Sequence, residues 1–196
     1  MRRRKEASLQ VLEIVHGPLP KEVHTRPSAE LRAALPRLNE MIHDHPRAAV
    51  HELREWIARE PNPMLFNWLG MAYGMLGEVE ALRETVRENY ARNPRYLFAR
   101  VNQAQMCVRD GDLAGAREAL GASFDIRALL GGRRRVHVSE FAAYFYVVGL
   151  YHLETGDMEA AEGVYDLLAE GAPDETGTDE LRRLLYPRLR DLFFRR

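Results

Sequence analysis

The residues that could perform chemistry in this chain are few and scattered. The segment 43–45, with the sequence His-Asp-His, and the nearby His51 carry side chains that suit a divalent metal ion. Their spacing matches no established metal-binding motif. His45 directly precedes Pro46 at a predicted helix boundary. We therefore interpret this cluster as a solvated cap and turn, and we predict no metal site.

Cys107 is the only cysteine among the 196 residues, which excludes an internal disulfide and a cysteine-based zinc site within one chain. It takes the place of Tyr73 when the repeats described below are aligned, so we expect an inert buried thiol. The sequence has no glycine-rich phosphate loop, no nucleophile elbow and no paired carboxylates at a recognisable spacing. We predict that the protein is not an enzyme and carries no cofactor.

Arginine clusters are the evidence for a different function. They comprise residues 2–4, residues 133–135 and, near the end of the chain, Arg188, Arg190, Arg195 and Arg196. If the clusters share one face, they could contact the phosphates of a nucleic acid. No aromatic residues are interleaved with them to stack on bases, and the formal net charge is only -1. We favour solvated ends and a loop, and we keep an arginine-mediated nucleic-acid-binding module as the alternative function.

A recurring helix-turn-helix pattern organises the middle of the chain. Each copy has an apolar helical run, a turn and a second apolar run, and the turns are Gly77-Glu78-Val79, Gly111-Asp112-Leu113 and Gly156-Asp157-Met158. The first two turn glycines are 34 positions apart (111 minus 77) and the next two 45 (156 minus 111). The pattern predicts an insertion at about residues 123–139, where a helix runs on to Leu130 and a loop or short extended piece follows at 133–138.

Other elements surround these copies. Apolar spacing predicts a helix over residues 5–16, followed by a linker to residue 27. Ser28 is a suitable N-cap for the next helix, which Pro36 should kink or split near Leu35. Residues 46–60 resemble the second half of a degenerate repeat. We thus predict an N-terminal helix and linker (1–27), a repeat domain (28–177) and a C-terminal capping helix (178–196) that begins at Thr178.

The copies resemble the tetratricopeptide repeat, a 34-residue helix-turn-helix unit. The match covers roughly residues 46–173, and the residues that carry it in the first copy are Phe66, Leu69, Gly70, Tyr73, Gly77 and Pro94. Leu82 departs from the family, which usually has alanine there. The resemblance implies an all-α fold, a right-handed α-solenoid of antiparallel helix pairs with a concave groove.

In that family, ligands lie in the groove lined by the first helix of each repeat. The positions that the resemblance assigns to this groove are Met64, Asn67, Met71, Met75, Phe98, Val101, Asn102, Gln105, Arg109, Tyr146 and Leu150. They are mostly apolar with a few amides, and flexible methionines suit a surface that adapts to a partner helix or extended peptide. The predicted function is a scaffold that binds a peptide or helix of another protein.

As a helix, the segment 141–151 would be apolar around its whole circumference. Either the insertion and the C-terminal helix cover it, or it meets a partner or a second copy of the chain in a homodimer. Its length is about half of the roughly 20 residues that a membrane-spanning helix needs. Gln10 and Glu13 interrupt what would be the apolar core of an export signal. We therefore predict no membrane span and a cytoplasmic protein.

Overall fold

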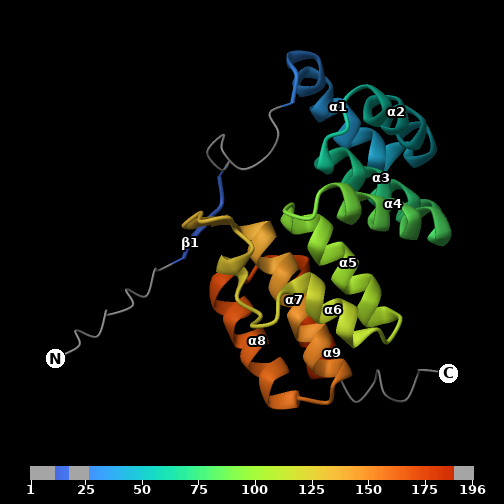
Figure 1. Ribbon diagram of the computed structural model, residues 1–196. Coiled ribbons are helices and arrows are strands. Elements are labelled where there is room, and N and C mark those ends of the chain that lie inside the picture. The colour runs from blue at the N-terminus through green and yellow to red at the C-terminus, as the bar shows by residue number, and fades with distance from the viewer. Residues whose placement is uncertain (1–11, 18–26, 188–196) are drawn as a thin grey trace.

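The computed structural model describes residues 12–17 and 27–187 (Figure 1). Within these residues the fold is mostly helical, with nine α-helices, one short 3-10 helix and two short strands. In chain order the elements are β1 Glu13–Val15, α1 Ala29–Asp44, α2 Pro46–Arg59, α3 Pro63–Leu76, α4 Val79–Arg92, α5 Leu97–Arg109, α6 Leu113–Leu120, the 3-10 helix Ile126–Ala128, β2 Arg135–His137, α7 Val138–Glu154, α8 Met158–Gly171 and α9 Thr176–Leu185. None of the helices described is long and apolar enough to cross a membrane.

The three turn glycines have the same backbone geometry. Gly77, Gly111 and Gly156 adopt φ angles of 70°, 75° and 74°, a left-handed conformation that disfavours any residue with a Cβ. The second helix of each pair begins two residues after its glycine. In the second and third pairs, the aspartates Asp112 and Asp157 cap that helix by accepting a hydrogen bond from a backbone N–H three residues on. The predicted helix-turn-helix copies are confirmed as local structures.

The first helix begins as the sequence predicts. The Ser28 hydroxyl oxygen accepts a hydrogen bond from the N–H of Leu31 at 3.0 Å, which satisfies one of the free donors at the helix start. Pro36 does not split α1, which is continuous from Ala29 to Asp44. The apolar face of α1, with Leu38 and Ile42 fully buried, packs on α2 and α3 and holds the helix together across the proline.

The buried apolar residues form two separate clusters. The N-terminal core lies among α1, α2 and α3, with one side of α4 against it, and its largest side chains include Leu31, Leu53 and Tyr73. The C-terminal core lies among α5 to α9 and includes Tyr144 and Leu168. Figure 1 shows the two groups of helices one above the other, with α4 and α5 at their junction.

Two sequence predictions fail near the insertion. Glu13–Val15 forms a strand that pairs in parallel with Arg135–His137, so a helix over 5–16 is wrong for residues 13–15, and residues 1–11 lie outside the described part. The second helix of the second copy ends at Leu120, not at Leu130. The prediction of a short extended piece at 133–138 is confirmed by β2.

The segment 141–151 lies in α7 and is covered by the chain itself. Leu181 of α9 packs so closely on Gly149 that a Cβ there would lie 2.5 Å from its Cδ2 atom. The Tyr144 hydroxyl is buried and donates to the carbonyl oxygen of Leu120 at 2.9 Å. The C-terminal helix therefore covers part of this segment, as the first of the two alternatives predicts, while Phe141 and Phe145 line a cavity. The capping helix begins at Thr176 instead of Thr178, whose buried hydroxyl donates to the Ala172 carbonyl oxygen at 2.7 Å.

Candidate functional site

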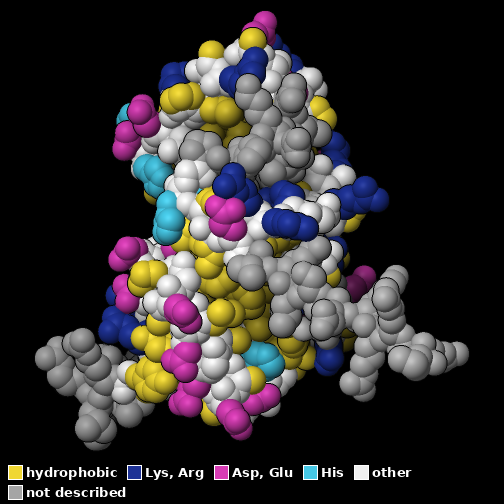
Figure 2. All heavy atoms as spheres, turned by 90° about the vertical axis from the view of Figure 1, so that its left-hand side faces the viewer, with side chains coloured by type: hydrophobic (Ala, Val, Ile, Leu, Met, Phe, Trp, Pro, Cys, Tyr) yellow, Lys and Arg dark blue, Asp and Glu magenta, His cyan; other side chains and the backbone are white. Residues whose placement is uncertain are grey.

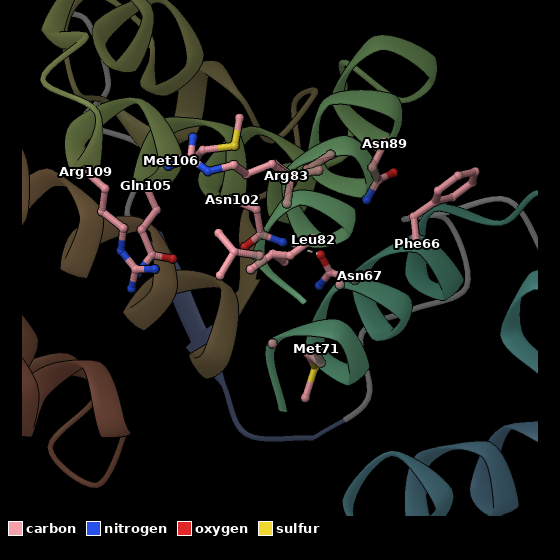
Figure 3. Close-up of a pocket in the computed structure, with 15 residues that line it drawn as sticks. Phe66, Asn67, Met71, Leu82, Arg83, Asn89, Asn102, Gln105, Met106 and Arg109 are labelled. Carbon is pink, nitrogen blue, oxygen red and sulfur yellow. Dashed lines mark hydrogen bonds between the residues drawn. The ribbon is translucent and has the colours of Figure 1, made fainter. Parts of the chain in front are cut away.

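A pocket of about 300 Å³ lies at the junction of the two cores, and we call it the junction pocket. Three helices form it: α3 and α4 from the N-terminal half, and α5 from the C-terminal half (Figure 3). Its lining residues are Phe66, Asn67, Gly70, Met71, Gly74, Val79, Leu82, Arg83, Val86, Asn89, Ala99, Asn102, Gln105, Met106 and Arg109. Because α5 packs much more extensively on α6 and α7 than on α3, space remains between α3 and α5.

Polar side chains meet across the pocket. The side-chain amide of Asn102 donates to the Asn67 side-chain oxygen at 2.5 Å and links α5 to α3. Gln105 and Arg109 lie one helical turn apart on α5, and Figure 3 shows their side chains next to each other on the same side of that helix. Arg109 makes no ion pair with any residue that the structure describes. These groups offer amide donors, amide acceptors and one guanidinium to a ligand.

An ion pair bridges the two halves at the same place. Arg83 of α4 donates from both terminal nitrogens to the Asp110 carboxylate at 2.5 and 2.6 Å. The hydrogen bond from Arg83 holds the pKa of Asp110 below its usual value. The pairing neutralises Arg83, so Arg109 remains the free cationic group of the pocket.

The apolar wall of the pocket comes mainly from α4. Leu82 and Val86 project from this helix, and Leu82 lies against the bare backbone of Gly70, where a Cβ would be 3.3 Å from its Cδ1 atom. The absence of a side chain at Gly70 thus allows α3 and α4 to approach. Met71 is 45% exposed and presents a flexible apolar side chain at the edge of the pocket.

The structure brings together five of the eleven residues that the repeat resemblance assigns to a groove. They are Asn67, Met71, Asn102, Gln105 and Arg109. The other six lie elsewhere: Val101 is buried in the C-terminal core, Tyr146 and Leu150 pack against that core, Met75 is exposed, and Met64 and Phe98 are partly buried. The six do not line the junction pocket.

The C-terminal part of the predicted groove is partly covered by α9. Gly177 lies against Tyr146, since a Cβ on this glycine would be 3.0 Å from the tyrosine Cβ. Burial raises the pKa of Tyr146 to about 12, and a hydrogen bond with Glu180 contributes, while Arg109 lowers it. Tyr146 of α7 therefore packs against α9, and Arg109 lies close enough to Tyr146 to affect its pKa.

Sequence reasoning missed the contribution of α4. In the family, ligands contact the first helix of each repeat, whereas here Leu82, Arg83 and Val86 of a second helix form one wall. The available signal was the departure from the family pattern at Leu82, a large residue where a small one is usual. Gly74, one helical turn after Gly70 on α3, is a second signal, because no atom lies within 4 Å of the place its Cβ would take.

The arginine cluster at 133–135 is largely engaged within the chain. Arg133 donates to both carboxylate oxygens of the buried Glu140 at 3.1 Å. Arg135 donates to both carboxylate oxygens of Glu13 at 2.8 and 2.9 Å. Two of the three guanidinium groups are thus neutralised by neighbouring carboxylates. The clusters at residues 2–4 and 188–196 lie outside the described residues.

The other candidate residues are Cys107 and the potential metal ligands of the described chain. Cys107 is 6% exposed, and burial raises the pKa of its thiol, which disfavours the nucleophilic thiolate. This confirms the buried position predicted for it. No group of three or more histidine, cysteine, aspartate or glutamate side chains among the described residues could hold a metal ion.

The junction pocket is therefore the candidate site: a partly apolar hollow with convergent amides and, among the described residues, one guanidinium without an ion-pair partner. Its walls come from both cores, so its shape depends on how the two halves meet. Comparisons of the chain with protein-family models, with curated proteins and with solved structures find no match.

Proposed function

We propose that the protein is an adaptor of the tetratricopeptide-like class, a right-handed α-solenoid of antiparallel helix pairs, which binds a segment of another protein at the junction pocket. The segment carries one apolar side chain that enters the pocket and an acidic group that pairs with Arg109. Peptide backbone beside these groups hydrogen-bonds with Asn67, Asn102 and Gln105. The adaptor needs no cofactor and performs no covalent chemistry.

The observation that carries this proposal is the chemistry of the pocket wall. Leu82, Val86 and Met71 provide apolar contact, while the amides provide both donors and acceptors. Ligand pockets typically combine a hydrophobic lining with a few placed polar groups and begin at about 300 Å³. The size of the junction pocket suits a single large side chain of a peptide rather than a whole cofactor.

The repeat character of the helix pairs supports the family assignment. Three turns share a left-handed glycine, and a second helix starts two residues after each of them. Repeat proteins of this kind stack units that contact mainly their neighbours, and they bind partners on the extended concave surface that the stack creates. The pocket between α3, α4 and α5 lies where one such unit meets the next.

A peptide selection tests the proposal without knowledge of the partner. A random twelve-residue peptide library is displayed on phage and selected on the full chain, with the Arg109→Glu and Gln105→Ala variants as counter-targets. We expect enriched peptides that combine an apolar and an acidic residue. Their binding should weaken by about tenfold or more on Arg109→Glu, because the charge-assisted hydrogen bond becomes a repulsion.

The matched control is Arg32→Glu, which reverses an exposed arginine of α1 outside the pocket. It should leave binding of the selected peptides unchanged. The proposal fails if no peptide is enriched, or if the enriched peptides bind the Arg109→Glu and wild-type chains equally well. A mobility-shift titration with a mixed-sequence RNA and DNA at low salt addresses the alternative, and a clear shift there would favour the nucleic-acid-binding module.

A further inference from the structure

The surface beside β2 is a second place where an extended segment is held. Glu13–Val15 pairs in parallel with Arg135–His137, in a register that sets Ile14 opposite Val136. The backbone N–H of Glu13 donates to the carbonyl oxygen of Arg134 at 2.9 Å. The two strands belong to distant parts of the sequence, so β1 docks on β2 as a separate segment and does not form a hairpin with it.

Two features of this surface select the chemistry of the docked strand. The guanidinium of Arg135 holds the Glu13 carboxylate through two hydrogen bonds. Ile14 lies against Gly171, the last residue of α8, where a Cβ would be 2.8 Å from both the Cδ1 atom of Ile14 and the Cε1 atom of Phe141. The site therefore accepts a carboxylate followed by a branched aliphatic side chain, in extended conformation.

The docked strand does not fill the available space. A cavity of about 800 Å³ runs alongside it, and its apolar walls include Leu12, Ile14, Phe141, Phe145 and Leu167. Figure 2 looks onto the side of the molecule that carries β1 and shows hydrophobic side chains gathered in the lower half of that face, with basic side chains above them. A segment with larger apolar side chains than those of β1 would bury more surface and gain dispersion contacts here.

We propose that the β2 groove, formed by Arg135, Phe141 and Gly171, is a binding site for an extended segment of a partner protein in which an acidic residue precedes a branched aliphatic one. The partner adds to β2 as a parallel strand. Glu13–Val15 occupies the groove as an intramolecular competitor. This site is separate from the junction pocket and does not depend on its function.

The competition between Glu13–Val15 and a partner segment can be expressed as an effective concentration. A segment on the same chain as its binding site competes at an effective concentration that is on the order of 1 mM for tethered segments. An external peptide of the same sequence must displace Glu13–Val15. Its apparent Kd is the intrinsic Kd divided by the fraction of chains in which the groove is free. A partner segment binds better than β1 only if it uses the unfilled cavity, for example with a large side chain in the place of Leu12.

The test uses a fluorescently labelled peptide with the sequence of residues 10–17, titrated into the full chain. The Ile14→Asp chain should bind it at least about tenfold more tightly than the wild-type chain, because its own strand no longer competes. A peptide that carries Ile14→Asp is the matched control and should not bind. A peptide with Leu12→Trp should bind more tightly than the original, because it enters the cavity.

A charge exchange tests the register. In the Ile14→Asp chain, a further Arg135→Glu change should weaken binding of the peptide several-fold. A peptide with Glu13→Arg should restore the lost affinity. Far-UV circular dichroism verifies that each chain is folded, and the Glu13→Arg chain replaces Ile14→Asp if the latter is not.

Three results would overturn the proposal. One is the absence of peptide binding to a folded chain whose own strand carries Ile14→Asp or Glu13→Arg. Another is an Arg135→Glu effect that the exchanged peptide does not recover. The third is a wild-type dimer, seen by sedimentation, that the Ile14→Asp change dissociates, because the occupant would then be a second copy of the chain.

Discussion

The two cores differ in how they are closed. The N-terminal core is formed by helices alone, and its apolar residues come from α1 to α3 with one side of α4. The C-terminal core has aromatic residues at its centre, such as Phe141 and Tyr144, and it is closed by α9 and by β1 from the other end of the chain. Helices alone enclose the first core, whereas β1 also packs against the second.

The junction between the cores differs from both. The contacts that bridge it include a hydrogen bond, Asn67 to Asn102, and an ion pair, Arg83 to Asp110, beside a pocket that no side chain fills. Polar contacts exchange with water at little net gain, so they stabilise the junction less than apolar burial stabilises either core. Stability therefore resides mainly inside the cores, and the proposed junction site lies where they meet.

The largest predicted effects come from cavities in the two cores. Leu53 and Leu168 are each fully buried, one in each core. We expect Leu53→Ala and Leu168→Ala to lower the free energy of unfolding by about 2–5 kcal/mol each. Hydrogen exchange followed by mass spectrometry should show faster exchange mainly in α1 to α4 for the first variant and mainly in α5 to α9 for the second.

The exposed Leu184 gives the matched control, because Leu184→Ala should change the free energy of unfolding by no more than about 0.5 kcal/mol. If exchange became equally faster throughout the chain in both core variants, the two cores would unfold together. The junction would then not separate two regions of independent stability.

The next effect concerns the packing of α9 on α7. Gly149→Ala places a Cβ 2.5 Å from Leu181 and should cost about 1–3 kcal/mol of stability through overpacking. Gly163→Ala, in a helix of the same core, meets no atom within 4 Å and should stabilise by about 0.5–1 kcal/mol. Thermal unfolding of the two variants measures the loss of stability expected for Gly149→Ala and the gain expected for Gly163→Ala. A neutral Gly149→Ala would mean that α9 does not close over α7.

A smaller effect is expected at the junction hydrogen bond. Asn102→Ala removes the donor to Asn67 and should lower stability by about 1 kcal/mol, the usual net value of one hydrogen bond. A double-mutant cycle with Asn67→Ala, measured by urea unfolding, isolates the coupling between the two side chains. A coupling energy as large as the cost of either core cavity would contradict a weak polar junction.

The smallest effect is the pH dependence of the junction ion pair. The pKa of Asp110 is lowered in the folded chain, so its contribution to stability is fully present above its unfolded value, near 3.8, and is lost as pH falls through the folded pKa. The difference in Tm between wild type and Asp110→Asn should therefore be small at pH 7 and should narrow below about pH 4. A difference that widens on acidification would assign Asp110 another role.

Local signals in the sequence predict the helices well. The cap at Ser28 and the glycine at each turn are properties of neighbouring residues, so the helix starts and the three turns can be located without tertiary information. The strand β1 cannot be found in this way. Glu13–Val15 lies in a segment with helical spacing of apolar residues, but it forms a strand because it pairs with residues 135–137, far along the chain. Tertiary pairing here outweighs local preference.

The site is predictable in part for a similar reason. The repeat pattern identifies Asn67, Met71, Asn102, Gln105 and Arg109, which line the pocket. The same pattern also assigns other residues of α3 and α5 that do not line it, namely Met64, Met75, Phe98 and Val101. The wall from α4 and the cover of α9 over Tyr146 depend on how far neighbouring helices stand apart. That spacing results from the size of individual side chains in contact, such as Leu82 on Gly70. The periodicity of apolar residues in the sequence does not predict it.

The most direct test of recognition at the junction is a nitrogen-15 NMR titration of the full chain with a peptide obtained from the selection described above. The side-chain amide signals of Asn67, Asn102 and Gln105 report on the pocket itself. The adaptor account predicts that these three signals shift together with the Nε signal of Arg109, and that they saturate at one peptide per chain. Unchanged signals at these residues, with shifts confined to other surfaces, would contradict it.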